Sequence, residues 1–354
     1  MASGEGAEAF LAAQRGFAEA ASLKPGEVIS LSGKLAGRHL SISLAGKALA
    51  AAIGPSFAHL NHSIVKAGQM AATSIRLWDC AGTGVGRPPS PSDAEWSASG
   101  EGWRTSSHDG GRYLCEDRLG SLLWLDRRDA ELVGCFADAS SLDCTVRARP
   151  LRRVMGEYCR SLGIQEIHAG LVSREGRGLL IVGGSGQGKT TTSLDGLHGG
   201  LDFLGDDSVG IGDGEAGGMR GYSLYGSARV LPHQLSRWPC FARHWQLPEP
   251  PEDKALFLPG IHLPERVPTT TSIVAVAVPR VAGHGLRVDP TSPLDALHAL
   301  LHESRDNRRF GLTAVEFSRI AALIKSVPCY RFEVDDDPGR VAGALHELIG
   351  QGEK

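Results

Sequence analysis

The sequence has no long hydrophobic run and no basic segment followed by an apolar core near its start. Its longest apolar stretches, such as residues 273–278, are far shorter than the ~20 residues of a membrane-spanning helix. The first ten residues lack the pattern of a secretory signal peptide. We therefore expect a soluble cytoplasmic protein that does not bind a membrane.

Paired cysteines and an excess of one charge are also missing. Seven cysteines are scattered through 354 residues without a C-x-x-C pair, which argues against a disulfide framework and a zinc site. The net charge is −3, so nothing indicates nucleic acid as a partner. The G-x-S-x-G elbow of α/β-hydrolases is absent. Residues 207–210 fit the D-x-x-G of GTPases, but no N-K-x-D motif accompanies them.

What the sequence does contain is a glycine-rich loop of defined pattern. Residues 183–190 read Gly-Gly-Ser-Gly-Gln-Gly-Lys-Thr and satisfy the phosphate-binding pattern G-x-x-x-x-G-K-[ST]. Glycines allow successive backbone N–H groups to converge on one anion. Lys189 supplies a charge for the β and γ phosphates, and the Thr190 hydroxyl is a ligand for Mg²⁺.

The neighbours of this loop support the same interpretation. Residues 179–182 predict a buried strand, and residues 190–197 predict a helix that ends at the glycines 199 and 200. The alternative is an ordinary turn in a chain with 46 glycines. We expect ATP phosphates to bind at Gly183, Gly184, Ser185, Gly186, Gln187, Gly188, Lys189, Thr190 and Thr191.

A pair of carboxylates follows the loop. Asp206 and Asp207 end a second apolar segment, where an acidic group would meet the metal of a bound nucleotide. Phosphoryl transfer to a hydroxyl needs one carboxylate on Mg²⁺ and another to accept the proton. Adjacent carboxylates repel each other, so a metal is a natural partner for one of them. The alternative is an acidic turn on the surface.

The rest of the chain predicts two domains, 1–149 and 150–354, each long enough for its own core. We expect a smaller α+β domain followed by the domain with the phosphate loop. Residues 81–111, rich in Gly, Ser and Pro, predict a surface loop, and residues 246–270 a proline-rich connector. Helices are predicted at residues 5–22, 47–60, 151–162, 292–303, 313–326 and 339–349, and a hairpin at 28–44.

Several short segments carry a resemblance to a known family. They are residues 167–172, 183–190, 200–209, 222–231 and 327–332. Together they resemble the catalytic domain of HPr kinase/phosphorylase and its relatives, bacterial serine kinases related in fold to phosphoenolpyruvate carboxykinase. The likeness is greatest to peptide-tailoring kinases of the lasso-peptide type, and it covers residues 150–335.

This resemblance implies an α/β catalytic domain with a mixed sheet, and roles for particular residues. His168 is similar to the family's active-site histidine, although a buried core histidine is the alternative. Arg229 matches a position usually held by Lys or Arg that stabilises the transferring charge, although a surface arginine is the alternative. Magnesium is assigned to Thr190 and Asp207, but which of Asp206 and Asp207 binds metal and which acts as base stays open.

The function expected from the sequence is transfer of the γ-phosphoryl group of ATP to a serine hydroxyl of a peptide or protein. Residues 212–221 depart from the family's signature for HPr contact and dephosphorylation, so HPr as the substrate and reverse phosphorylase activity stay open. Two alternatives stay open: an ATPase or small-molecule kinase with the same loop, and a non-catalytic module gated by nucleotide. The N-terminal domain is expected to help recognise the acceptor, and a homo-oligomer is the default expectation.

Overall fold

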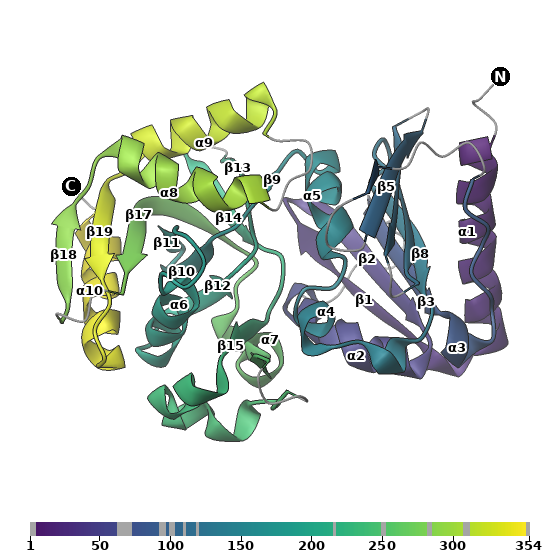
Figure 1. Cartoon of the computed structure of the whole chain (residues 1–354), viewed down its shortest axis with the longest axis horizontal. Helices are drawn as coiled ribbons and strands as arrows, with labels where there is room; N and C mark the ends of the chain where they lie inside the picture. Colours follow the sequence, from purple (N-terminus) through teal and green to yellow (C-terminus); the bar gives the residue numbers. More distant parts are fainter. Residues whose placement is uncertain are drawn as a thin grey trace. The chain divides into compact units, whose positions relative to one another are not determined.

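The chain divides into two units, Met1–Gly163 and Ile164–Lys354, each with its own sheet (Figure 1). The sequence predicts a boundary after residue 149, and helix α5 (Arg152–Ser161), which follows it, is grouped with the first unit. This computed structural model describes residues 5–61, 73–91, 97–98, 103–108, 111–117, 120–214, 217–248, 253–281, 285–306 and 312–351.

The first unit is built on one mixed sheet. Its strands are β1 (Val28–Leu35), β2 (Arg38–Ala45), β3 (Thr73–Asp79), β4 (Ser97–Ala98), β5 (Trp103–His108), β6 (Arg112–Asp117), β7 (Leu122–Asp126) and β8 (Glu131–Phe136). They lie in the order β1-β2-β3-β8-β7-β6-β5-β4. β3 pairs in parallel with β2 and β8, and the other neighbours are antiparallel, so the predicted hairpin at 28–44 is confirmed.

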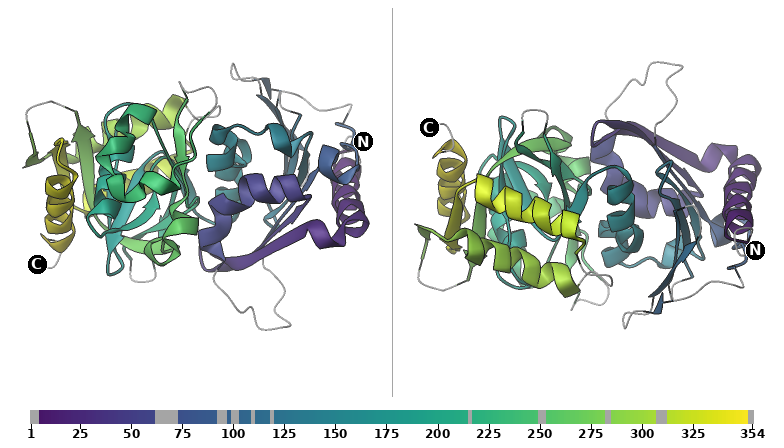
Figure 2. Two further views of the ribbon diagram at one scale, coloured as in Figure 1. Left: turned by 90° about the horizontal axis from the view of Figure 1, so that it is seen from below. Right: turned by 90° about the horizontal axis from the view of Figure 1, so that it is seen from above.

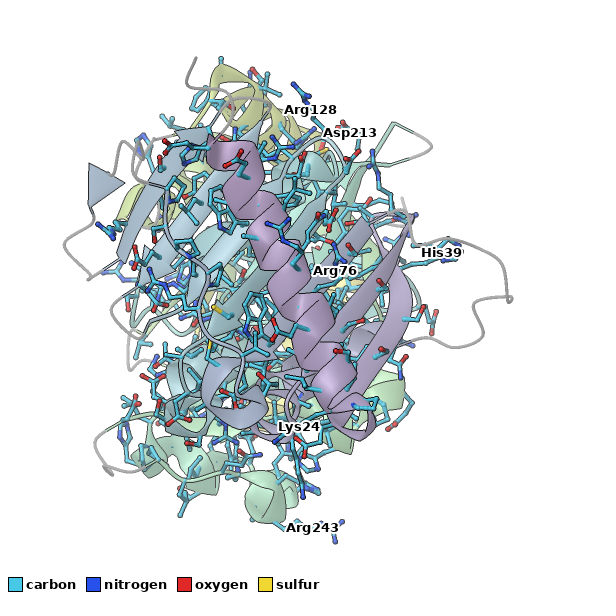
Figure 3. All side chains as sticks on the ribbon, turned by 90° about the vertical axis from the view of Figure 1, so that its right-hand side faces the viewer. Lys24, His39, Arg76, Arg128, Asp213 and Arg243 are labelled. Atoms are coloured by element: carbon cyan, nitrogen blue, oxygen red, sulfur yellow. The ribbon has the colours of Figure 1, made fainter. Side chains whose placement is uncertain are left out.

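Helices lie on both faces of this sheet (Figures 1 and 2). They are α1 (Glu5–Leu23), α2 (Lys47–Phe57), α3 (Cys80–Thr83), α4 (Cys144–Ala148) and α5. The apolar stripe of α1 packs on one face, where Phe10 and Phe17 join Trp78 in a buried cluster. Arg76 of β3 lies beside α1 (Figure 3), with its guanidinium carbon 5.8 Å from the centre of the Phe17 ring.

The predicted loop at residues 81–111 is wrong for residues 81–83, 97–98 and 103–108, which belong to α3, β4 and β5. Strand β5 pairs along its whole length with β6, and the pairing satisfies its backbone groups although its side chains are mostly polar. Propensity within the segment does not reveal a partner that lies later in the chain. Residues 92–96, 99–102 and 109–110 of the predicted loop lie outside the described residues.

The second unit is built on a larger mixed sheet, as the sequence predicts. Its strands are β9 (Gln165–Ile167), β10 (Gly170–Arg174), β11 (Arg177–Ile181), β12 (Asp202–Gly205), β13 (Val209–Asp213), β14 (Met219–Ser223), β17 (Thr270–Arg280), β18 (Arg287–Pro290) and β19 (Cys329–Glu333). The main path runs β12-β10-β11-β17-β14-β13-β9, and β19 pairs with β17 and β18. β17 is parallel to β11 and to β19, whereas the other pairs are antiparallel.

Two layers of helices enclose this sheet (Figures 1 and 2). They are α6 (Lys189–His198), α8 (Pro293–Asp306), α9 (Ala314–Ser326) and α10 (Pro338–Gly350). Successive residues of β11 point to opposite layers: Leu180 shares a buried cluster with Leu323 of α9, and Leu179 shares one with Leu345 of α10. The helices predicted at 292–303, 313–326 and 339–349 are thus confirmed as α8, α9 and α10.

Residues 225–248 and 253–267 form a small layer against α6. This layer contains β15 (Ala228–Val230), β16 (Ala255–Phe257) and the short helix α7 (Pro259–His262). Trp238, Phe241 and Phe257 share a buried cluster with Leu194 and Leu197 of α6. The segment at 246–270, predicted as a connector, therefore contributes a strand and part of the core. Among the helices of the described residues, none has the length and apolar character to cross a membrane.

Candidate phosphate-binding site

The predicted strand–loop–helix unit is present. Strand β11 ends at Ile181, the loop follows, and α6 begins at Lys189. Gly186 and Gly188 have φ values of 76° and 99°, a left-handed conformation that glycine adopts without strain. The Thr192 N–H donates to the Gly188 carbonyl oxygen at 2.8 Å and starts the helix. In general the first N–H groups of a helix have no partner within the helix and can bind an anion, with the positive end of the helix dipole behind them.

Side chains of the loop already contact its backbone. The Lys189 ammonium donates to the carbonyl oxygens of Gly183 and Gly184 at 2.7 and 3.1 Å. The Gln187 side-chain oxygen accepts a hydrogen bond from the Gly184 N–H at 2.7 Å. Lys189 is buried, so its charge is held inside the curve of the loop. A bound phosphate would need the Gly184 N–H that Gln187 now accepts and the Lys189 N–H groups that the loop carbonyl oxygens now accept.

The pairing of three strands brings His168, Asp206 and Asp207 to this loop. β10 begins at Gly170, which pairs with Ile181 at the end of β11. The next residue of β10, Leu171, pairs with Gly205 at the end of β12. His168 precedes β10, and Asp206 and Asp207 follow β12 directly. The histidine, the phosphate loop and the acidic pair therefore lie at one edge of the sheet.

One contact joins the histidine to the acidic pair. His168 Nε2 lies 3.6 Å from Asp207 Oδ1, and the two side chains are 14% and 20% exposed. Asp206 is 5% exposed and thus more deeply buried than its neighbour. Asp206 and Asp207 therefore have different surroundings. Two neighbouring carboxylates can take different catalytic roles when their surroundings differ in this way.

The sequence analysis missed Glu166, which lies two residues before His168. The Ser208 hydroxyl donates to the Glu166 carboxylate and ties the residue after the acidic pair to β9. Ser208 itself is buried, with 6% of its surface exposed. The only signal in the sequence was the spacing of two between Glu166 and His168, which favours a common face in an extended segment.

Arg229 is positioned differently from the other predicted residues. It lies in β15, and its guanidinium pairs with Asp253 at 3.0 Å. Its neighbours Ala228 and Val230 pack into the cluster below α6. Its expected role in stabilising the transferring charge stays a prediction.

A second unpredicted feature anchors α6. Asp195 of α6 is fully buried and accepts two hydrogen bonds from Arg237, at 2.8 and 2.6 Å, and one from the Trp238 indole at 2.9 Å. Burial raises the pKa of Asp195 above its ordinary value, and Arg237 opposes that rise. Arg237 also donates to the backbone oxygens of Asp335 and Asp336. The helix behind the phosphate loop is thereby fixed to two other segments.

No protein-family model and no curated protein matches the chain. Among solved structures, the HPr(Ser) kinase/phosphatase from Coxiella burnetii is similar at 14% identity over 53% of this chain and 95% of that chain, with a TM-score of 0.29. At that TM-score the likeness carries no argument about this chain.

Proposed function

We propose that the second unit binds ATP with Mg²⁺ and transfers the γ-phosphoryl group to the hydroxyl of a serine in a peptide or protein. The observation that carries this proposal is the meeting of the phosphate loop, His168 and the pair Asp206–Asp207 at one edge of the sheet. A loop for phosphates and carboxylates for metal and proton are the parts that phosphoryl transfer needs.

The side chains present suit magnesium. Carboxylate oxygens of Asp206 and Asp207 and the hydroxyl of Thr190 are hard donors of the kind this ion prefers. Within the described residues, no group of three or more His, Cys, Asp or Glu side chains is arranged to hold a metal. In proteins, Mg²⁺ usually keeps several waters and binds through one or two carboxylates and the substrate phosphates. When bound, Mg²⁺ would neutralise charge on the phosphates.

The nucleotide phosphates would be held by the loop. In the proposed complex the Lys189 ammonium leaves the carbonyl oxygens of Gly183 and Gly184 for the β and γ phosphates. The Gly184 N–H leaves the Gln187 side chain and donates to a phosphate oxygen. Thr191 adds an N–H group from the first turn of α6.

The contact of His168 with Asp207 favours Asp207 as the proton acceptor. The proposal therefore reverses the assignment of magnesium to Asp207 made from the sequence and gives the metal to Asp206 with Thr190. The serine oxygen forms a bond to the γ phosphorus, and the bond from that phosphorus to the β–γ bridging oxygen breaks. ADP departs with the electron pair of the broken bond, and the serine proton moves to Asp207. His168 would fix the orientation of the Asp207 carboxylate.

The acceptor follows from the family that the sequence resembles, and a serine-bearing peptide is our choice among hydroxyl acceptors. In this proposal the first unit recognises the acceptor, the enzyme works in the cytoplasm where ATP is available, and copies of the chain assemble. Reverse phosphorylase activity is not part of the proposal.

The test is phosphate transfer from Mg·ATP to candidate serine peptides, followed by intact-mass spectrometry. Lys189→Ala, Asp206→Asn and Asp207→Asn are each expected to lower the transfer rate by roughly 10²-fold or more. Lys325→Ala and Asp213→Asn, at exposed positions, are the matched controls. Undiminished transfer in the three site variants contradicts the mechanism, and full hydrolysis without an acceptor indicates an ATPase.

A further inference from the structure

An apolar wall lies beside the phosphate loop on the side away from the acidic pair. β11, β17 and β19 run in parallel, so their carboxyl ends share one edge of the sheet (Figure 1). Val281 follows the end of β17 and Val334 follows the end of β19. The Val334 N–H donates to the Arg280 carbonyl oxygen at 3.0 Å, which holds these two ends together.

Both valines lie close to the start of α6. A β-carbon placed on Gly188 would lie 3.2 Å from Val334 Cγ2 and 3.5 Å from Val281 Cγ2. Val334 packs partly against the core beneath α10. Val281 is 65% exposed, so a large apolar side chain faces solvent directly beside the residues proposed to hold phosphate.

The order of the strands sets the direction of a nucleotide across this edge. β11 and its loop lie between β10 and β12 on one side and β17 and β19 on the other. His168 precedes β10, and Asp206 and Asp207 follow β12, so they adjoin the first side, toward which the proposed mechanism directs the γ phosphate. The nucleoside, at the other end of the phosphate chain, is therefore directed toward Val281 and Val334.

We propose that Val281 and Val334 form one wall of the site for the nucleotide base. This inference depends on the proposed function, because it needs a nucleotide with its phosphates in the loop. The flat faces of a base are apolar, and covering Val281 removes exposed apolar surface from water. The two side chains carry no hydrogen-bonding group, so they contribute affinity for a base without selecting which base is bound.

The test compares the binding of ATP and of inorganic tripolyphosphate, both with Mg²⁺, by calorimetry on the full chain. Val281→Ser is expected to weaken ATP binding about fivefold, from the lost apolar contact, and to leave tripolyphosphate binding unchanged. Val315→Ser replaces another valine, 68% exposed on α9, and is expected to change neither.

The outcomes separate this inference from the proposed function. Unchanged ATP binding in Val281→Ser overturns the base site, and so does an equal loss for ATP and tripolyphosphate, which would indicate a disturbed loop. If the unmodified protein binds tripolyphosphate and ATP equally well, the base has no site here. The inference then fails while the proposed function stands. If the unmodified protein binds neither, the proposed function fails and the inference fails with it.

Discussion

At the scale of single residues, the phosphate loop is occupied by its own side chains. Gln187 accepts the Gly184 N–H that a phosphate would use, so it competes with the ligand. Gln187→Ala is therefore expected to tighten the binding of tripolyphosphate about fivefold, the value of a modest hydrogen bond. Calorimetry checks this, with Gln234→Ala as the control. Weaker binding in Gln187→Ala would show that the amide supports the loop instead.

Substitution of His168 is expected to affect the rate of phosphoryl transfer but not the binding of phosphate. If this histidine orients Asp207, His168→Gln lowers the transfer rate by roughly 10–100-fold while tripolyphosphate still binds with unchanged affinity. His298→Gln, at an exposed position of α8, is the control. Steady-state rates and calorimetry on the same samples test this. A parallel loss of binding and rate would indicate a structural role.

At the scale of elements, α6 depends on one buried ion pair. Arg237→Ala would leave the Asp195 carboxylate buried without its cation, so the free energy of unfolding is expected to fall by about 3–5 kcal/mol near neutral pH. Because burial already raises the pKa of Asp195, the deficit should shrink at acid pH, where the carboxyl takes up a proton. Urea unfolding at two pH values measures both effects. Arg243→Ala, exposed in the same layer (Figure 3), should change neither.

The layer beside α6 contains two imidazoles in close contact, with their ring planes inclined at 31°. The rings of His244 and His262 lie 4.2 Å apart, and burial, then the neighbouring His244, lowers the pKa of His262 below its ordinary 6.5. Because the pKa of His262 is lower in the folded chain, the unfolded chain binds the proton more tightly. The stability contributed by the neutral imidazole is therefore complete above pH 6.5 and is lost as the pH falls from 6.5 through the lowered pKa. His262→Gln is expected to reduce the slope of unfolding free energy as the pH falls below 6.5. His298→Gln should leave the slope unchanged, and an unaltered slope in both variants would refute the assignment.

Local signals explain which elements could be predicted. Helices α1, α9 and α10 have apolar stripes of helical period, and α9 begins with a capping box of Thr313 and Glu316. The phosphate loop is a contiguous pattern. Two contacts join residues 42 positions apart: the bond from Ser208 to Glu166 and the pair of Arg237 with Asp195. No short-range pattern in the sequence predicts either contact. Strand β5 was missed for a different reason: its side chains are mostly polar, and its pairing with the neighbouring strand β6 stabilises it as a strand.

At the scale of the whole molecule, the residues of the candidate site all belong to the second unit. The phosphate loop, His168 and the acidic pair lie within residues 164–354. A fragment of these residues is therefore expected to fold and to bind Mg·ATP with the affinity of the full chain. Circular dichroism and calorimetry test this, with Lys189→Ala in the fragment as the control. A fragment that folds but does not bind would show that the first unit completes the site.

The bonds from Lys189 to the loop carbonyls have a consequence for how an anion enters. Because the ammonium is already anchored, its stem has little rotamer entropy left to lose when a ligand arrives. An incoming phosphate exchanges neutral oxygen partners for anionic ones, which make shorter and stronger bonds. Association should then release heat from the first contact, without a preceding slow step that orders the chain.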